Sequence, residues 1–173
     1  YPIYTEALRN RFCELVRRSY VITPNLTEAL ILLYGKEKME AIWREFQEIS
    51  GRERLDQIEE TGRRLAEEFS LSAVVITGVD YREGEELVKI GNLVLEKEKS
   101  SWVFAEKSGG SYSGTGDLFA SVLSAGLVKG YSMKKCAHLA VDFISASIRD
   151  AVEEGTDRND GVCFEAHLGR LIQ

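Results

Sequence analysis

Residues 73–78 carry the sequence AVVITG, an uninterrupted apolar run that stops at Thr77 and Gly78. A continuous apolar run of this kind is typical of a strand in a parallel sheet that is covered on both faces. We expect Gly78 to end the strand. Helices must then pack on both sides of it, which predicts an α/β fold.

Helical patterns lie on both sides of this strand along the chain. Apolar side chains at helical spacing predict helices over 4–19, 25–33, 36–49, 54–69, 115–129 and 132–153, and a last helix ending near residue 172. A short strand is expected over 20–23, where Pro24 stops it, and two or three antiparallel strands are expected between 86 and 106. The alternation of strands and helices favours one layered α/β domain.

The composition narrows the class of protein. With 44% hydrophobic and 29% charged residues, the 173-residue chain resembles an ordinary globular domain. Its net charge of −6 argues against general nucleic-acid binding, and no apolar run approaches the roughly 20 residues of a membrane helix. The three cysteines lie far apart without metal-ligand spacing, which favours a reducing compartment. We therefore expect a cytoplasmic protein with no nucleic-acid or membrane partner.

A glycine-containing segment carries the strongest chemical signal. Residues 113–119 read SGTGDLF and lead directly into an apolar helical pattern. Glycines let a ligand approach the backbone, and the first turn of a helix presents N–H groups at a positive dipole end. We therefore expect Gly114, Thr115 and Gly116 to hold an anion, with the Asp117 carboxylate within reach of it. That arrangement suits removal of a proton from an alcohol during phosphoryl transfer.

Polar segments are expected to meet this motif at one edge of the sheet. Ligands bind beyond the carboxyl ends of parallel strands in such folds, and residues 23–25 and 77–78 both follow expected strands. Their convergence favours a ligand site over the other interpretation of the motif, a turn followed by an acid that favours a helix start. Asn25 and Glu28 also have the spacing of an N-cap and a capping-box acid, which requires no metal.

Taken together, these segments resemble the pyridoxal kinase family, a branch of the ribokinase-like superfamily. The matching stretches are ITPNLTEA at 22–29, VVITG at 74–78 and SYSGTGDLFA at 111–120, in the order and at the spacing of that family. The resemblance implies a ribokinase-like α/β fold, with a central mostly parallel sheet flanked by helices and an antiparallel β segment around 86–106. It implies an enzyme that transfers the γ-phosphate of ATP to the 5′-hydroxymethyl group of pyridoxal, pyridoxine or pyridoxamine in vitamin B6 salvage.

The resemblance also assigns roles to individual residues. Asp117 matches the catalytic base, and the amides of residues 114–116 match those that hold the transferring phosphoryl group. Glu28 matches an acid that organises Mg²⁺ through water, and Thr23 matches a position near a K⁺ or Na⁺ site. The implied ATP-binding residues are Asn25, Thr77, Gly78, Ser108, Gly109, Gly110 and Thr115.

One position separates close relatives within the superfamily. Hydroxymethylpyrimidine kinases of the thiamine pathway share the Thr-Pro-Asn and Gly-Thr-Gly segments but usually carry cysteine where Asp117 stands. The acid therefore favours the vitamin B6 kinase. Hydroxymethylpyrimidine phosphorylation is the alternative function.

The family has a longer chain than this one. Residues 1–173 match the C-terminal part of its kinase domain, which holds the nucleotide cradle and the catalytic base. The N-terminal half of the family supplies the vitamin pocket, the lid and the dimer contacts. The resemblance thus implies a homodimer whose partners are ATP and a B6 vitamer, and it predicts that these residues alone are inactive. A truncated nucleotide-binding remnant without catalysis is the other interpretation.

Overall fold

The computed structural model describes residues 5–83 and 87–172. Residues 1–4, 84–86 and 173 lie outside the described part, and with them the first residue of the antiparallel segment expected from 86. The elements, in chain order, are α1 (Glu6–Val16), β1 (Val21–Ile22), α2 (Leu26–Glu48), α3 (Gly51–Phe69), β2 (Ala73–Glu83), β3 (Leu87–Glu96), β4 (Lys99–Glu106), α4 (Thr115–Val128), α5 (Met133–Glu154) and the 3₁₀ helix η1 (Glu165–Leu171).

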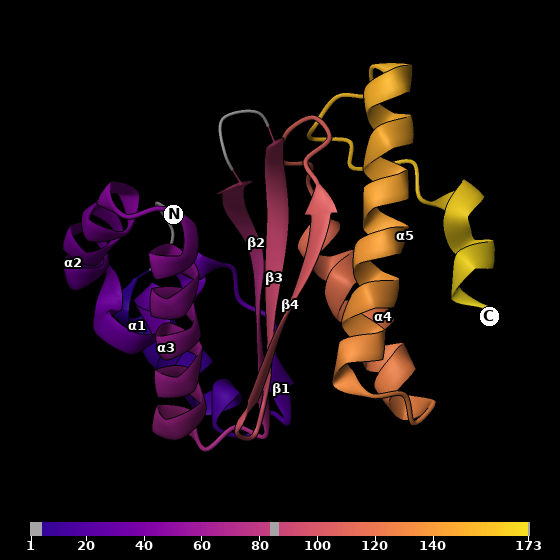
Figure 1. Cartoon of the computed structure of the whole chain (residues 1–173). Helices are drawn as coiled ribbons and strands as arrows, with labels where there is room; N and C mark the ends of the chain where they lie inside the picture. The colour runs from indigo at the N-terminus through magenta and orange to yellow at the C-terminus, as the bar shows by residue number, and fades with distance from the viewer. Residues whose placement is uncertain (1–4, 84–86, 173) are drawn as a thin grey trace.

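A four-stranded sheet separates two layers of helices (Figure 1). Helices α1, α2 and α3 cover one face, whereas α4, α5 and η1 lie on the other. The strand order is β1-β2-β3-β4, with β1 parallel to β2 and the other two pairs antiparallel. This mixed sheet between helices confirms the predicted α/β fold. Within the described ranges, no helix combines the length and apolarity needed to cross a bilayer.

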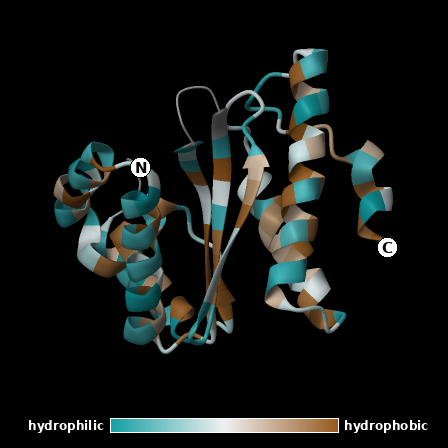
Figure 2. Ribbon diagram, viewed as in Figure 1, coloured by the Kyte–Doolittle hydropathy of each residue, from teal (hydrophilic) through white to brown (hydrophobic). Residues whose placement is uncertain are grey.

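Successive side chains of β2 serve the two helical layers in turn. Val74 and Ile76 belong to the core beneath α1, α2 and α3, whereas Ala73 and Val75 belong to the core beneath α4 and α5. All four side chains are at most 1% exposed. In Figure 2 the strands between the two helical layers carry long hydrophobic (brown) stretches. The apolar run at residues 73–76 therefore forms a strand buried on both faces, as predicted.

The prediction that Gly78 ends this strand is wrong. β2 continues to Glu83, and its pairing with β3 shifts register between Ile76 and Val79. Gly78 has φ +69°, a left-handed backbone that glycine adopts readily, so it forms a bulge rather than a terminus. The last helix is also tighter than expected, because residues 165–171 form a 3₁₀ helix.

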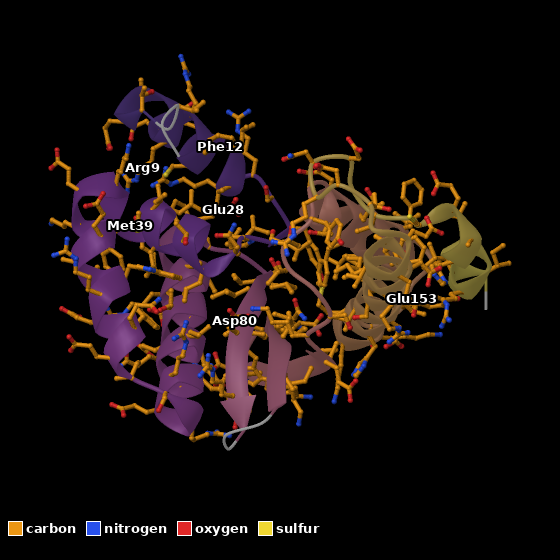
Figure 3. All side chains as sticks on the ribbon, turned by 90° about the horizontal axis from the view of Figure 1, so that it is seen from above. Arg9, Phe12, Glu28, Met39, Asp80 and Glu153 are labelled. Atoms are coloured by element: carbon orange, nitrogen blue, oxygen red, sulfur yellow. The ribbon has the colours of Figure 1, made fainter. Side chains whose placement is uncertain are left out.

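Arg9 fixes the predicted break between residues 33 and 36. Gly35 has φ +77° and ψ 165°, which interrupts the helical path within α2. Arg9, labelled in Figure 3, donates from Nε to the Ile31 carbonyl and from Nη2 to the Leu32 carbonyl, each at 2.8 Å. Carbonyls in the last turn of a helix lack intrahelical partners, so this guanidinium stabilises the end of the first segment of α2.

Helices α4 and α5 come into close contact at a glycine. An ideal Cβ placed on Gly126 would lie 2.6 Å from Sγ of Cys136. Cys136 is fully buried, and this burial raises the pKa of its thiol, so the sulfur is a packing group in its protonated form. The absence of a side chain at Gly126 thus sets the distance between the two helices.

We expect Gly126→Ala to lower the free energy of unfolding by about 1–2 kcal/mol. Overpacking a filled core costs about 1–3 kcal/mol, and the better helix propensity of alanine offsets about 1 kcal/mol of it. The double variant Gly126→Ala/Cys136→Ala should recover stability, because it removes the sulfur that the new methyl group meets. Urea denaturation of the single and double variants checks this. A single variant as stable as the wild type would show that the helices separate without cost.

Candidate functional site

The segment after β1 meets the bulge of β2, so the two polar segments lie together as predicted, although Thr77 and Gly78 lie inside β2 and not at its end. The Thr77 amide donates to the Pro24 carbonyl at 2.9 Å, and Asn25 and Thr77 form an isolated parallel bridge. Thr23 follows β1 directly and is half-buried. The segments 23–25 and 77–78 therefore lie side by side at the edge where α2 begins.

Asn25 and Glu28 form the predicted capping box at the start of α2. The Glu28 amide donates to Oδ1 of Asn25 at 2.9 Å, and the Asn25 amide donates to Oε2 of Glu28 at 3.0 Å. These two bonds satisfy backbone donors that the first turn of the helix leaves without partners. Both side chains thus have a structural function that requires no ligand, and their metal and nucleotide roles stay predictions.

The first turn of α4 is open. Gly114 is the N-cap with φ +79°, and an ideal Cβ at either Gly114 or Gly116 would meet nothing within 4 Å. Helices α1 and α5 differ, since the side chains of Thr5 and Ser132 cap them. A glycine N-cap offers no side-chain oxygen, so a ligand can approach the backbone N–H groups of this turn directly.

Two side chains of the first turn of α4, those of Thr115 and Asp117, lie next to its open backbone. Thr115 Oγ donates to the Tyr112 carbonyl at 3.1 Å, which fixes the loop that precedes the helix. Asp117 is exposed in the first turn of α4. A carboxylate therefore stands one residue beyond the open backbone, and its reach to a bound anion stays a prediction.

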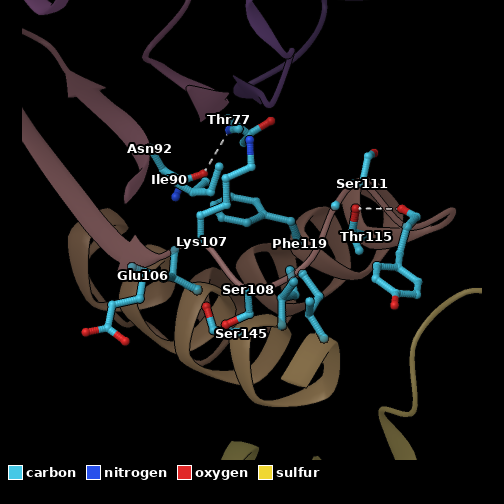
Figure 4. A pocket seen from close by; sticks show the side chains of 18 of the residues that line it. Thr77, Ile90, Asn92, Glu106, Lys107, Ser108, Ser111, Thr115, Phe119 and Ser145 are labelled. Carbon is cyan, nitrogen blue, oxygen red and sulfur yellow. Dashed lines mark hydrogen bonds between the residues drawn. The ribbon is translucent and has the colours of Figure 1, made fainter. Parts of the chain in front are cut away.

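A cavity of about 320 Å³ connects the end of the β1–β2 pair with the start of α4 (Figure 4). It lies between the sheet and α5, and its apolar wall includes Ile90, Ile144 and Ile148. Its lining includes the predicted site residues Thr77, Gly78, Ser108, Gly110, Thr115 and Gly116. The other predicted residues do not line it: Thr23, Asn25, Glu28, Gly109, Gly114 and Asp117.

Charged residues that the sequence analysis missed stand in the cavity wall. Lys107 Nζ donates to both carboxylate oxygens of Asp80, at 2.8 and 3.0 Å, and Glu106 lines the same cavity. The ion pair joins β2 to the segment after β4, across the intervening strand β3. No motif marks either residue, because their meeting depends on the pairing of three strands.

Asn92 is a further residue that the sequence analysis missed. It lies in β3, lines the cavity and is 5% exposed. A signal was present, because an amide inside the otherwise apolar stretch around Leu93 is unusual for a buried strand.

The glycines at 109 and 110 have a packing explanation. An ideal Cβ on Gly109 would lie 2.6 Å from Cγ2 of Val152, and one on Gly110 would lie 2.5 Å from Nη1 of Arg158. The Arg158 carbonyl also accepts from the Ser113 amide at 2.9 Å. The segment after α5 thus packs onto the loop before α4 and excludes side chains at both glycines.

The donor set at this edge fits a magnesium ion only if phosphates and water complete its shell. The described part of the chain contains no group of three His, Cys, Asp or Glu side chains that could hold a metal ion. Glu28 offers a half-buried carboxylate, one oxygen of which already accepts from the Asn25 amide. Mg²⁺ is commonly held by one or two carboxylates together with substrate phosphates and retained waters. A site with the single carboxylate of Glu28 fits this pattern.

Comparisons with known proteins agree on one family. The family model described as phosphomethylpyrimidine kinase matches residues 2–161. A pyridoxine kinase from Bacillus subtilis strain 168 is 27% identical over 154 residues, which cover 87% of this chain and 48% of that protein.

Solved structures show the same similarity. A candidate phosphomethylpyrimidine kinase from Bacteroides thetaiotaomicron VPI-5482, crystallised with pyridoxal, is 26% identical with a TM-score of 0.79, covering 100% of this chain and 56% of that one. The pyridoxal kinase of Staphylococcus aureus, solved with AMP-PCP and pyridoxal, shares the fold at 19% identity and a TM-score of 0.64, covering 86% of this chain and 49% of that one. The chain thus spans about half the length of the relatives that it matches.

Proposed function

The chain belongs to the phosphomethylpyrimidine kinase family, among ribokinase-fold proteins that resemble pyridoxal kinases, and from this premise we propose that its protein phosphorylates vitamin B6. The acceptor is the 5′-hydroxymethyl group of pyridoxal, pyridoxine or pyridoxamine, and the donor is ATP. Residues 1–173 supply the C-terminal part of the kinase domain. The activity is proposed for the intact protein, because the relatives are about twice as long as this chain.

The observation that carries this proposal is the open first turn of α4 beside the cavity. Gly114 and Gly116 leave the backbone accessible there, and Thr115 and Gly116 also line the cavity. A phosphate chain needs N–H donors at one end, whereas a nucleoside needs an apolar slot at the other. The helix start and the wall that contains Ile144 and Ile148 provide both features within one site.

Asp117 acts as the general base in the proposed reaction. Its carboxylate takes the proton from the acceptor hydroxyl, whose oxygen forms a bond with the γ-phosphorus as the bond to the leaving ADP oxygen breaks. The amides of residues 114–116 stabilise the negative charge on the equatorial oxygens of the transferring group. ADP and the 5′-phosphate ester are the products.

The remaining predicted residues surround the phosphates. The backbone amide of Thr77 already donates a hydrogen bond to the Pro24 carbonyl. The Thr77 side chain is therefore the group proposed to contact the nucleotide. Asn25 and Ser108 are proposed to flank the same ligand. Glu28 would organise Mg²⁺ through water, and Thr23 would stand near a K⁺ or Na⁺ ion. Mg²⁺, when bound, neutralises charge on the phosphates.

Hydroxymethylpyrimidine is the second candidate acceptor. The description of the matching family model favours it, whereas the carboxylate at Asp117, in place of the cysteine usual in those kinases, favours vitamin B6. A homodimer in the cytoplasm completes the proposal.

A competition assay tests the function. The intact protein is incubated with ATP, Mg²⁺ and equal concentrations of pyridoxal and hydroxymethylpyrimidine, and mass spectrometry follows which compound gains a phosphoryl group. We expect phosphorylated pyridoxal to form first. Phosphorylation of the pyrimidine alone would assign the second function, and no product from either would leave a nucleotide-binding protein without this catalysis.

We expect Glu28→Gln to raise the Mg²⁺ concentration needed for half-maximal activity by roughly 10-fold, the scale at which an outer-shell partner affects metal affinity. Glutamine retains an oxygen that can accept from the Asn25 amide, so the capping box and the melting temperature should stay unchanged. Magnesium titrations of the wild type and the variant check this. An unchanged titration would mean that Glu28 only caps the helix.

A further inference from the structure

The bulge in β2 places two residues opposite one. Ile76 pairs with Leu93 and Val79 pairs with Gly91, so Thr77 and Gly78 together face Asn92. Bulges of this kind interrupt the ladder of backbone hydrogen bonds and turn the strand. A backbone donor in such a bulge must find another acceptor, because a buried N–H group is rarely left without one.

The Asn92 side chain bridges the bulge to the next strand. Its Oδ1 accepts from the Gly78 amide at 3.2 Å (Figure 4). Its Nδ2 donates to the Val103 carbonyl at 3.3 Å. Asn92 also pairs with Val103 along the β3–β4 ladder, so one residue ties β2 and β4 together. An asparagine amide can do this because it carries both a donor and an acceptor.

The side-chain amide of Asn92 is buried, which costs free energy unless its polar atoms are hydrogen-bonded. Asn92 is 5% exposed, and its neighbour Leu93 is fully buried. A buried amide is unfavourable unless its polar atoms are bonded, so a valine would suit a purely structural strand better at this position. Here both polar groups of the amide are bonded, one of them to the bulge.

We propose that Asn92 is the positioning residue of the nucleotide site. By holding the Gly78 amide, it keeps the Thr77–Gly78 bulge turned into the cavity wall, where the phosphate chain of the nucleotide meets a preformed surface. The Thr77 amide is fixed from the other side by the Pro24 carbonyl. The bulge is thus anchored to β3 and to the segment that follows β1, and its geometry does not have to form when the ligand binds. This inference rests on the proposed function.

Calorimetric titration with ADP tests the inference on the intact protein. We expect Asn92→Ala to weaken ADP binding roughly 10-fold, the scale of one lost hydrogen-bonded contact, while the KM for the vitamin stays unchanged. Asn92→Ser is the second variant, because it is a small polar replacement that is expected to fold. Its hydroxyl is too short to reach both neighbours, so it should weaken binding in the same direction.

Val94→Ala is the matched control. Val94 lies two residues further along β3 on the same side and is buried, but it pairs with Val75 outside the bulge. It should lower the melting temperature without changing ADP affinity. Unchanged ADP affinity in both Asn92 variants, or an equal loss in Val94→Ala, would overturn the positioning role. If wild-type protein binds no ADP, the proposed function itself fails.

Discussion

We expect Asp117→Asn to lower turnover about 100-fold or more, the scale of losing a general base. Asparagine has nearly the same size but cannot take a proton from the acceptor hydroxyl. The substitution leaves Gly114 and Gly116 in place, so the turn should stay open. ADP affinity should therefore be retained or slightly increased, because a negative charge beside the phosphates has been removed.

Asp56→Asn is the control for this experiment. Asp56 is also an exposed helical acid, but it pairs with Arg52 at 2.9 Å on α3, across the sheet from α4. Its replacement should leave turnover unchanged. Turnover is measured at saturating ATP and vitamin, and ADP affinity is measured by calorimetry. Near wild-type turnover in Asp117→Asn would remove this carboxylate from the mechanism.

We expect Phe143→Ala to lower the free energy of unfolding by about 3–5 kcal/mol, the range for deleting a buried aromatic side chain. Phe143 is 1% exposed on α5 and meets the ring of Phe164 edge-on, with 6.4 Å between centroids. The cavity left by its removal lies in the core beneath α4 and α5, next to the ring of Phe164. Because interiors are closely packed, closing that space requires a shift of α5, whose residues 141–148 also contribute to the wall of the 320 Å³ cavity.

Phe104→Ala provides a matched comparison for that loss. Phe104 is 38% exposed, stacks on Trp102 and meets the ring of Tyr81 at a tilt, so it buries less apolar area. Its replacement should cost about 1 kcal/mol, close to the value of an aromatic pair. Urea denaturation of both variants checks the difference. Similar losses at the two positions would show that α5 is not packed as described.

The fold was largely predictable because its signals are local. The apolar residues 73–76 form the doubly buried strand, and the expected helices over 115–129 and 132–153 agree with α4 and α5 to within one residue at each end. The continuation of β2 beyond Gly78 was not predictable from the same signals. Glycine marks both strand ends and bulges, and only the pairing of β2 with β3 distinguishes them.

The candidate site also contains residues that could be predicted from the sequence and residues that could not. Residues 114–117 are contiguous in sequence, so their arrangement at a helix start could be predicted from their types alone. Asn92, Asp80 and Lys107 enter the cavity wall through the register of three strands, which no local pattern specifies. Gly109 and Gly110 were predicted as nucleotide-binding residues because they resemble a motif. The structure gives these glycines a packing reason as well, because residues 152 and 158 leave no room for a side chain at either position.

A crystal structure of the intact protein with AMP-PCP and Mg²⁺ tests the central claim most directly. The account predicts phosphates against the amides of residues 114–116 and the nucleoside in the cavity beside Ile144 and Ile148. The Asp117 carboxylate should face the terminal phosphate from the acceptor side. An analogue bound elsewhere, with the first turn of α4 still open, would contradict it.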